Sequence, residues 1–371
     1  MSTDDLKEII NEFKIEGVAN QIKPFGSGHI HDTFLVTNGD LSKDSYILQK
    51  INTSIFQDVD NLMENIRIVT DHLQKKAISK PGADPKRDVL TLIPAKSGKS
   101  YIKDEKGSYW RVFVFIADTN SYDLVETDKQ AFEGGKGYGG FFAELSDLDA
   151  TRLHEILPDF HNVVSRFSLL EKAISSDPAG RVADVEREIS FVKERIDSMR
   201  KIHDLGEKGA LPLKTTHNDT KFNNVLLNSK DEAQCVIDLD TVMPGYVAFD
   251  FGDAIRTIVN TAEEDEKELS KIDINLSFFE SFAKGFISAA GDQLSKIEAE
   301  SLAEGSLLLP YIIGMRFLTD HIDGDNYYKI GFPGHNLQRA RAQFRLVEKL
   351  EENSEKLRDI VMSIYADNKK G

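Results

Sequence analysis

The chain has 371 residues, 40% of them hydrophobic and 29% charged, which is typical of one large bilobal or two smaller folded domains and excludes a disordered chain. Its net charge of −16 disfavours binding to nucleic acids or anionic membranes, because an acidic surface repels polyanions, and no apolar run reaches the ~20 residues of a membrane span. One cysteine, Cys235, excludes a disulfide framework or a cysteine-based zinc site, and without a visible secretory signal we expect a cytoplasmic protein.

The first third of the chain predicts short strands with two helices. Apolar residues at helical spacing favour an amphipathic helix over residues 6–13 and a longer one over residues 58–76, with Asp58 as its N-cap. Runs bounded by Gly, Asn and Asp predict strands over residues 18–25, 33–37, 46–51, 88–94, 100–103 and 108–116.

From about residue 118 onward the pattern becomes mostly helical. We expect helices over residues 129–146, 158–173, 182–203, 249–260, 277–289, 296–323 and 336–365, and strand fragments over 214–216 and 234–237. Pro310 should kink or divide the helix that contains it. This change of pattern predicts a mixed N-terminal lobe, residues 1–117, and a helical C-terminal lobe, residues 118–371, with a hinge near Ala117.

The most specific feature is a polar loop followed by an aspartate that ends an apolar strand. His217, Asp219 and Asn224 fit an H-x-D-x-x-x-x-N pattern, and Asp238 lies fourteen positions after Asn224. Phosphoryl transfer from a nucleotide needs a carboxylate that orients and deprotonates a hydroxyl group, and hard oxygen ligands for Mg²⁺. A simple Asp- and Asn-rich turn is the alternative for the loop alone, but the spacing to Asp238 favours a phosphotransferase site.

Taken together, these segments resemble the phosphotransferase family of aminoglycoside phosphotransferases, choline kinases and homoserine kinases, and within it the N-acetylhexosamine 1-kinases. The similarity extends in order along essentially the whole chain and is carried by residues 25–30, 46–49, 52–56, 216–224, 237–244, 249–256, 314–318 and 335–337. It implies an α+β, bilobal protein-kinase-like fold, with a small nucleotide-binding lobe built on an antiparallel sheet and a larger, mostly helical lobe that holds the catalytic loop and a sugar pocket.

The resemblance also implies a reaction and its catalytic residues. The reaction is ATP- and Mg²⁺-dependent phosphorylation of the anomeric hydroxyl of GlcNAc or GalNAc, by a chain expected to be a monomer. Asp219 would be the general base, and Asn224 and Asp238 would hold Mg²⁺ on the ATP phosphates. Asp240 is either a further metal ligand or a structural acceptor, and His217 is expected to be mainly structural.

Three further residues would bind the sugar: His29, Arg316 and Tyr327. The alternative for Arg316 is an ion pair with Asp320, four residues further along the helix. The alternative for His29 is a loop histidine that contacts nothing.

The lysine that this fold usually carries on its third strand is not obvious. Gln49 stands at the inward position, and strand alternation would turn Lys50 to the other side. We therefore predict that Lys221, two residues after Asp219, joins the metal in neutralising the transferred phosphate, and we count it among the catalytic residues.

The expected contacts to the nucleotide come mainly from the backbone. Gly26 and Gly28 lie between two strands and could close over phosphates through N–H groups, although hairpin glycines are mostly turn formers. Adenine would bind near Phe115 and Ala117. Residues 135–140 match G-x-G-x-x-G literally, but no strand precedes them, so we interpret them as part of a helix.

Two other functions can be weighed from the same residues. A sulfatase that needs a C/S-x-P-x-R stretch is excluded, because Cys235 is followed by Val-Ile-Asp and no serine occupies such a stretch. A kinase-shaped binding protein without activity is disfavoured by the intact Asp219, Asn224 and Asp238. Within the family, the alternative is a kinase of another small alcohol: a different hexosamine, an aminoglycoside, choline or homoserine.

Overall fold

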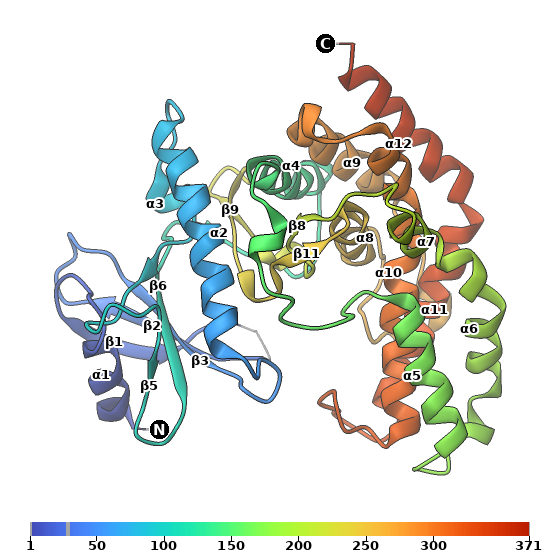
Figure 1. Ribbon diagram of the computed structural model, residues 1–371, viewed down its shortest axis with the longest axis horizontal. Coiled ribbons are helices and arrows are strands. Elements are labelled where there is room, and N and C mark those ends of the chain that lie inside the picture. Colours follow the sequence, from blue (N-terminus) through green and yellow to red (C-terminus); the bar gives the residue numbers. More distant parts are fainter. Residues whose placement is uncertain (1, 27–29, 371) are drawn as a thin grey trace.

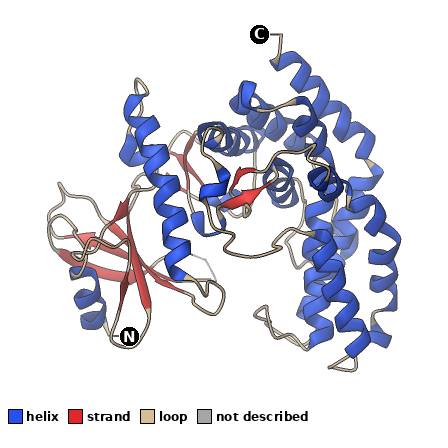
Figure 2. Cartoon of the chain, viewed as in Figure 1, coloured by secondary structure: helices blue, strands red, loops and turns tan. Residues whose placement is uncertain are grey.

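The computed structural model describes residues 2–26 and 30–370. A strand-rich N-terminal part lies beside a larger part that consists mostly of helices (Figures 1 and 2). The expected α+β, bilobal fold class is thereby confirmed. In the part of the chain that is described, no helix has the length and apolar character needed to cross a membrane.

A six-stranded antiparallel sheet forms the N-terminal part. Its strands lie in the order β1-β2-β3-β6-β4, and β5 pairs with β6 outside that path. Because successive side chains alternate between the two faces, both faces of the central strands carry buried residues. The strands are β1 (Ala19–Pro24), β2 (Asp32–Asn38), β3 (Tyr46–Ile51), β4 (Leu92–Ile93), β5 (Ile102–Lys103) and β6 (Tyr109–Val114).

Helices cover both faces of this sheet. On one face, α1 (Thr3–Asn11) buries Leu6 against a cluster that includes Trp110. On the other, α2 (Val59–Ser79) packs between the sheet and the helical part (Figure 1). Asp58 caps α2 as the sequence predicts, since its side chain accepts a hydrogen bond from the N–H of Asn61.

Two small sheets lie where the chain enters the helical part. After β6 ends, β7 (Thr119–Asn120) pairs with β9 (Val225–Asn228), which also pairs with β10 (Ala233–Val236). The second sheet joins β8 (Lys214–Thr216) to β11 (Met243–Gly245). The hinge expected near Ala117 falls in the connection between β6 and β7, and its use as a domain boundary stays a prediction.

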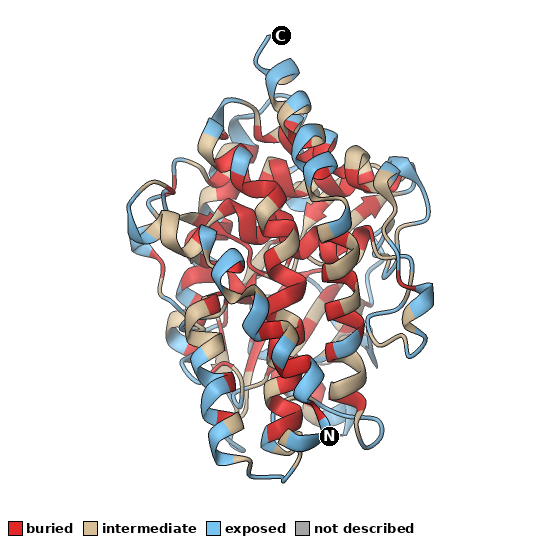
Figure 3. Ribbon diagram, turned by 90° about the vertical axis from the view of Figure 1, so that its right-hand side faces the viewer, coloured by how far each residue is buried: buried red, intermediate tan, exposed pale blue. Residues whose placement is uncertain are grey.

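The helical part is arranged around α10 (Lys296–Asp323). Ser295 and Glu298 form a capping box at its start, and the helix continues through Pro310 without being divided. Viewed from the helical side, buried residues form stripes along the inner helices (Figure 3). The remaining helices are α3 (Pro85–Asp88), α4 (Asp128–Leu145), α5 (Val163–Ser176), α6 (Glu186–Met199), α7 (Lys201–Glu207), α8 (Val247–Ile258), α9 (Leu276–Ala290), α11 (His335–Glu352) and α12 (Ser354–Asn368).

The glycine-rich segment 134–140 lies inside α4, which confirms that it is helical. Gly135 and Gly139 face α9 so closely that a Cβ on either would overlap the carbonyl oxygen of Phe282 or Phe286. Each glycine inside a helix costs ~1 kcal/mol against alanine. The close approach of the two helices offsets that cost, because it buries the apolar cluster that they share.

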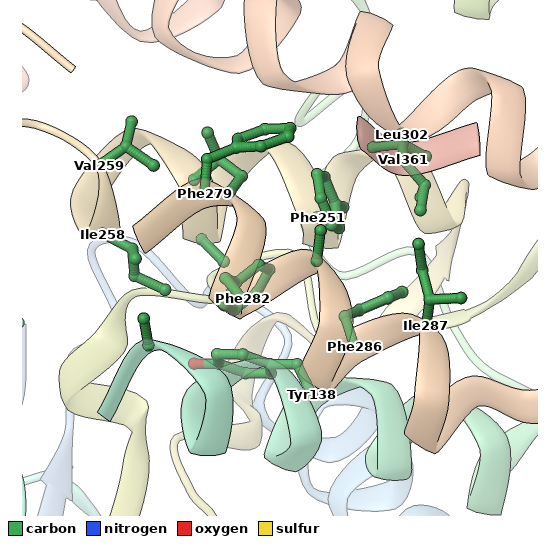
Figure 4. Close-up of a cluster of buried hydrophobic side chains, with 14 of the residues drawn as sticks. Tyr138, Phe251, Ile258, Val259, Phe279, Phe282, Phe286, Ile287, Leu302 and Val361 are labelled. Carbon is green, nitrogen blue, oxygen red and sulfur yellow. The ribbon is translucent and has the colours of Figure 1, made fainter. Parts of the chain in front are cut away.

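The apolar cluster shared by α4 and α9 also packs against the loop that carries the predicted base. Tyr138 of α4, Phe251 of α8 and Phe286 of α9 meet in it, as Figure 4 shows. The hydroxyl of Tyr138 donates a hydrogen bond to the backbone carbonyl of Lys221 at 2.6 Å. The packed helices are thus connected directly to the loop that carries the predicted base.

Candidate active site

The loop between β8 and β9 is held by a carboxylate from α8. Asp250 accepts hydrogen bonds from the backbone N–H of His217 at 2.8 Å and of Asn218 at 2.7 Å. Asn218 adopts a left-handed conformation with a φ of 64°, which Asn tolerates better than most residues. Burial raises the pKa of Asp250 to about 7. These bonds fix the backbone from which Asp219 extends.

His217 joins this loop to the strand that precedes Asp238. Its Nε2 lies 2.9 Å from the carbonyl oxygen of Ile237, and its Nδ1 lies 3.3 Å from the backbone nitrogen of Asp219. Because a carbonyl can only accept, Nε2 carries the proton and Nδ1 is the acceptor. Burial lowers the pKa of His217, so the ring is neutral. These contacts agree with the structural role expected for it.

Asp219, Lys221 and Asn224 lie together in the loop. The Lys221 Nζ is 3.2 Å from Asp219 Oδ1, and the Asn224 side-chain amide donates to the Asp219 carbonyl oxygen at 2.8 Å. Burial acts to raise the pKa of Asp219, but Lys221 and the other neighbouring groups together outweigh it, so the net pKa lies below the ordinary value. Asp219 is therefore ionised and able to accept a proton.

Asp238 follows β10 in a left-handed conformation, with a φ of 62°. The N–H of Ile237 donates to the carbonyl of Asn224 at 2.9 Å, which places the two predicted metal ligands side by side. Burial and the neighbouring carboxylates Asp240 and Asp219 raise the pKa of Asp238 well above its usual range. A bound cation would relieve this crowding of negative charge.

The donor set is compatible with Mg²⁺. The amide nitrogen of Asn224 is used by the loop, so its Oδ1 and the Asp238 carboxylate are the oxygens left for a hard cation. Across residues 2–26 and 30–370, no group of three His, Cys, Asp or Glu side chains forms a metal cage. Mg²⁺ typically takes only one or two protein carboxylates and completes its shell with water and phosphate oxygens.

Asp240 has partners of a different kind. Its carboxylate receives both terminal nitrogens of Arg111, with Nη2 at 2.7 Å from Oδ2, and the Nε2 of His31 lies 2.9 Å from the same oxygen. Burial acts to raise the pKa of Asp240, but Arg111 and His31 together outweigh it and hold the net pKa well below the usual range. Of the two roles left open for Asp240, these contacts favour the structural acceptor rather than the metal ligand.

Sequence reasoning missed Arg111 and His31. A signal for Arg111 was present, since it interrupts the apolar run of β6, and a buried guanidinium needs a buried anion. His31 carried no such signal, because it stands in a polar turn and its partner is 209 positions away in the sequence.

On the side of the helical part, Arg316 of α10 lies among aromatic rings. Its guanidinium is 4.9 Å from the ring centroid of Phe160, 5.8 Å from that of Tyr327 and 5.6 Å from that of Tyr328. The alternative ion pair is not formed, because Asp320 accepts hydrogen bonds from the backbone of residues 326–328 and from Asn336. The structure therefore brings together two of the three predicted sugar-binding residues, Arg316 and Tyr327.

Arg166 adds a second guanidinium to this wall, which sequence reasoning also missed. It donates to the carbonyl of Phe160 from Nε and Nη2, at 3.2 and 3.1 Å. Burial and the charge of Arg316 lower the pKa of Arg166 to about 10. Among the residues that the structure describes, neither arginine has a carboxylate within ion-pair distance. We call Arg166, Arg316, Phe160, Tyr327 and Tyr328 the arginine–aromatic wall.

His161 connects the arginine–aromatic wall to the catalytic loop. Its ring lies 4.5 Å from that of Phe160, and its Nε2 lies 2.9 Å from the carbonyl oxygen of Asn218, the residue before Asp219. Burial lowers the pKa of His161 to about 3, so the ring is neutral. The arginine–aromatic wall is thus linked to the backbone beside the predicted base.

The structure describes only some of the residues expected to contact the nucleotide. Gly28 and His29 lie outside the described residues. Phe25, beside Gly26, packs its ring edge-on against Phe115 with 5.5 Å between the centroids, so the end of the segment after β1 lies beside the residue that follows β6. Ala117 is exposed in the connection that follows. Adenine binding at Phe115 and Ala117 stays a prediction.

Comparison with known proteins finds the fold of this chain in a family of phosphotransferases and in several solved kinase structures. A family model described as phosphotransferase enzyme family matches residues 21–286. Among solved structures, the choline kinase from Cryptosporidium parvum Iowa II is 15% identical, with a TM-score of 0.62 over 96% of this chain and 97% of that one. The spectinomycin phosphotransferase in complex with ADP and spectinomycin is 13% identical, with a TM-score of 0.57 over 95% and 99%. The amicoumacin kinase hAmiN, bound to AMP-PNP and Ca²⁺, is 16% identical, with a TM-score of 0.55 over 92% of each chain.

Proposed function

Because this chain belongs to the phosphotransferase enzyme family, we propose that it transfers the γ-phosphoryl group of ATP to the anomeric hydroxyl of an N-acetylhexosamine, GlcNAc or GalNAc. The product is the sugar 1-phosphate, and Mg²⁺ is required. The observation that carries the choice of acceptor is the arginine–aromatic wall, which stands beside the catalytic loop.

The charge of this wall selects against cationic acceptors. Two guanidiniums without a paired carboxylate raise the free energy of a nearby quaternary ammonium or aminoglycoside cation. A neutral sugar has no such penalty, and its hydroxyl and acetamido oxygens can accept hydrogen bonds from Arg316. Tyr327 is 60% exposed and its ring can cover one face of a pyranose. The resemblance of residues 314–318 and 335–337 to N-acetylhexosamine 1-kinases points to the same acceptor.

The residues of the candidate site have distinct tasks in this reaction. Asp219, ionised beside Lys221, orients the anomeric hydroxyl and takes its proton as the oxygen bonds to the γ-phosphorus and the bond to ADP breaks. Asn224 and Asp238 would hold Mg²⁺, which supplies charge stabilisation on the phosphates when bound. Lys221 moves its ammonium onto the transferred phosphoryl group, and no covalent enzyme intermediate is needed.

An ADP-release assay over a panel of acceptors tests the proposal. The panel contains free GlcNAc, GalNAc, other hexoses and hexosamines, choline, homoserine and aminoglycosides. We expect kcat/KM to be highest for the two N-acetylhexosamines. A preference for choline or an aminoglycoside would refute the choice of acceptor while leaving the family reaction intact.

A matched variant tests whether the turnover belongs to this site. Asp219→Asn keeps the size of the side chain and removes its ability to accept a proton. We expect kcat to fall about 10²- to 10⁴-fold, the usual contribution of a general base. Lack of turnover by the wild type with every acceptor would favour a kinase-shaped binding protein instead.

A further inference from the structure

One buried ion pair crosses from the N-terminal sheet to the turn that follows Asp238. Arg111 of β6 and Asp240 lie 129 positions apart in the sequence, and their side chains are only 2% and 4% exposed. Two hydrogen bonds join the guanidinium to the carboxylate in a fork-to-fork arrangement, which fixes direction as well as distance. The proposed reaction leaves this pair without a task.

Arg111 lies beside the position where a third-strand lysine would be expected. In the register of the sheet it stands opposite Gln49, and its Nε donates to the Gln49 Oε1 at 3.0 Å. Lys50 is instead opposite Trp110, whose side chain packs on the α1 face. The positive charge that β3 lacks on this face is therefore supplied by Arg111 of β6. The Arg111 guanidinium is directed at Asp240 of the C-terminal part.

His31 completes the attachment. Its Nδ1 accepts the backbone N–H of Asn52 at 3.0 Å, so its Nε2 carries the proton that is donated to Asp240. The ring also stacks on Phe56 with 5.6 Å between centroids. Both oxygens of Asp240 are thus held by groups that belong to the N-terminal part of the chain.

The turn that these contacts hold includes the predicted metal ligand. Asp238 has a φ of 62°, which lies in the left-handed region that few residue types adopt. On one side, Ile237 is hydrogen-bonded to Asn224. On the other side, Asp240 is anchored by Arg111 and His31, two residues beyond the metal ligand.

We propose that Arg111, assisted by His31, is a positioning residue for the metal-binding turn, and that it does so by fixing Asp240. It acts through Asp240 rather than by touching ATP, because Nε, Nη1 and Nη2 are all directed at protein acceptors. This inference rests on the proposed function, since it requires Asp238 to hold the Mg²⁺ of a bound nucleotide. It makes the capture of that Mg²⁺ depend on a residue of the N-terminal sheet.

The test measures nucleotide binding, so it does not depend on the acceptor sugar. A fluorescent ADP analogue is titrated with Mg²⁺ and with EDTA into the wild type, Arg111→Gln and Arg111→Lys. We expect Arg111→Gln to weaken Mg²⁺-dependent binding about 10- to 100-fold, as losses of residues that orient metal ligands do, and to leave binding in EDTA unchanged. Arg111→Lys should bind more tightly than Arg111→Gln but less tightly than the wild type. Lysine keeps the positive charge, but it cannot form the two parallel hydrogen bonds of a guanidinium.

Arg195→Gln is the matched control. Arg195 also forms an ion pair, with Glu351 at 3.0 Å, but joins α6 to α11 away from the metal-binding turn. It should bind MgADP as the wild type does. If the Arg111 variants do not fold, His31→Phe provides the same test, because it keeps the stacked ring and removes the donor to Asp240.

Three results would contradict the inference in different ways. Unchanged Mg²⁺-dependent binding by Arg111→Gln would overturn it outright. An equal loss in EDTA would mean that Arg111 contacts the nucleotide itself, and would overturn the positioning role. Absence of Mg²⁺-dependent binding by the wild type would refute the proposed function together with the inference that rests on it.

Discussion

At the scale of single residues, the charge that each group carries is set by a few neighbours. Asp219 and Asp238 are both partly buried carboxylates, yet their pKa values move in opposite directions. Burial acts to raise the pKa of both groups. For Asp219, Lys221 and the other neighbouring groups together outweigh burial, whereas for Asp238 the charges of Asp240 and Asp219 add to it. The result is an ionised base beside a carboxylate that a cation would stabilise.

Removal of Lys221 should therefore change both the rate and its pH dependence. Asp219 must be ionised to work, so activity falls as the pH falls through its pKa. In Lys221→Ala that pKa should rise, and the acidic limb of kcat/KM against pH should move to higher pH. We also expect kcat to fall about 10²- to 10³-fold, the usual effect of losing one charge-stabilising group.

Lys221→Arg separates these two effects. It keeps the positive charge beside Asp219, so the acidic limb should stay near that of the wild type even if kcat drops. Near-normal turnover by Lys221→Ala would show that the metal alone neutralises the phosphate.

Arg316 can be tested in the same way on the acceptor side. Arg316→Gln removes the charge above the Phe160 ring and should raise KM for GlcNAc while leaving KM for ATP unchanged. Because the repulsion falls, KM for choline should move in the opposite direction. Steady-state kinetics with each substrate varied in turn measure both effects, and equal changes in KM for ATP and sugar would argue against a specific acceptor contact.

At the scale of helices and strands, the periodicity of apolar residues predicted well which segments are helical. It predicted poorly where each helix ends. The segment expected as one helix over residues 336–365 is two, because α11 ends at Glu352 and α12 begins at Ser354. The expected helix over 182–203 is likewise interrupted at Arg200. Neither break contains Gly or Pro. The apolar spacing continues across both, so only the packing of the adjoining helices decides where one ends.

Helix α4 offers a test of packing against propensity. Gly139→Ala would place a Cβ on the carbonyl of Phe286, whereas Gly140 has open space around it. Gly139→Ala should destabilise the protein by ~1–3 kcal/mol, as overpacking does, although alanine is the better helix former. Gly140→Ala should stabilise it by ~0.4–1 kcal/mol.

Urea denaturation of the two variants provides the measurement. Both replace glycine by alanine in one helix, so a difference between them reports the contact with α9 and not helix propensity. Equal stabilisation by both substitutions would mean that α4 and α9 can separate without cost.

At the scale of the whole molecule, the site is assembled from parts distant in sequence. The predicted base comes from the loop before β9, the arginine–aromatic wall from α5, α10 and the segments beside them, and the proposed anchor of the predicted metal-binding turn from β6. The net charge of −16 does not oppose ATP, because the phosphates would meet Mg²⁺ and Lys221 rather than the general surface. Binding at a site shared by both lobes should therefore stabilise the entire fold.

Thermal unfolding with nucleotide tests this expectation. A ligand at 100 times its Kd stabilises the folded state by ~2.7 kcal/mol. We expect ADP with Mg²⁺ to raise the Tm, and EDTA to remove most of the increase. Mg²⁺ without nucleotide should have little effect, because the protein offers only Asn224 and Asp238 as ligands. An increase in Tm that survives EDTA would show that nucleotide binding does not need the metal.

The sequence by itself determined the chemistry of the catalytic loop. Asp219, Asn224 and Asp238 stand within twenty residues, so their spacing along two short strands is a local property that a pattern can reveal. The antiparallel sheet and the helical part followed from periodicity in the same way. The position of the Arg111 cation opposite Gln49 did not follow, because it depends on which strand lies beside β3.

Only the tertiary structure decided the rest. Arg111 and Asp240 meet because β6 is placed opposite the turn after β10, and Arg166 joins Arg316 because α5 packs on α10. Such contacts join residues more than a hundred positions apart, and no local pattern encodes them. The reason is the free-energy cost of burying an unpaired charge. A buried guanidinium is stable only beside its partner, so its place is fixed by the folded surroundings and not by its neighbours in sequence.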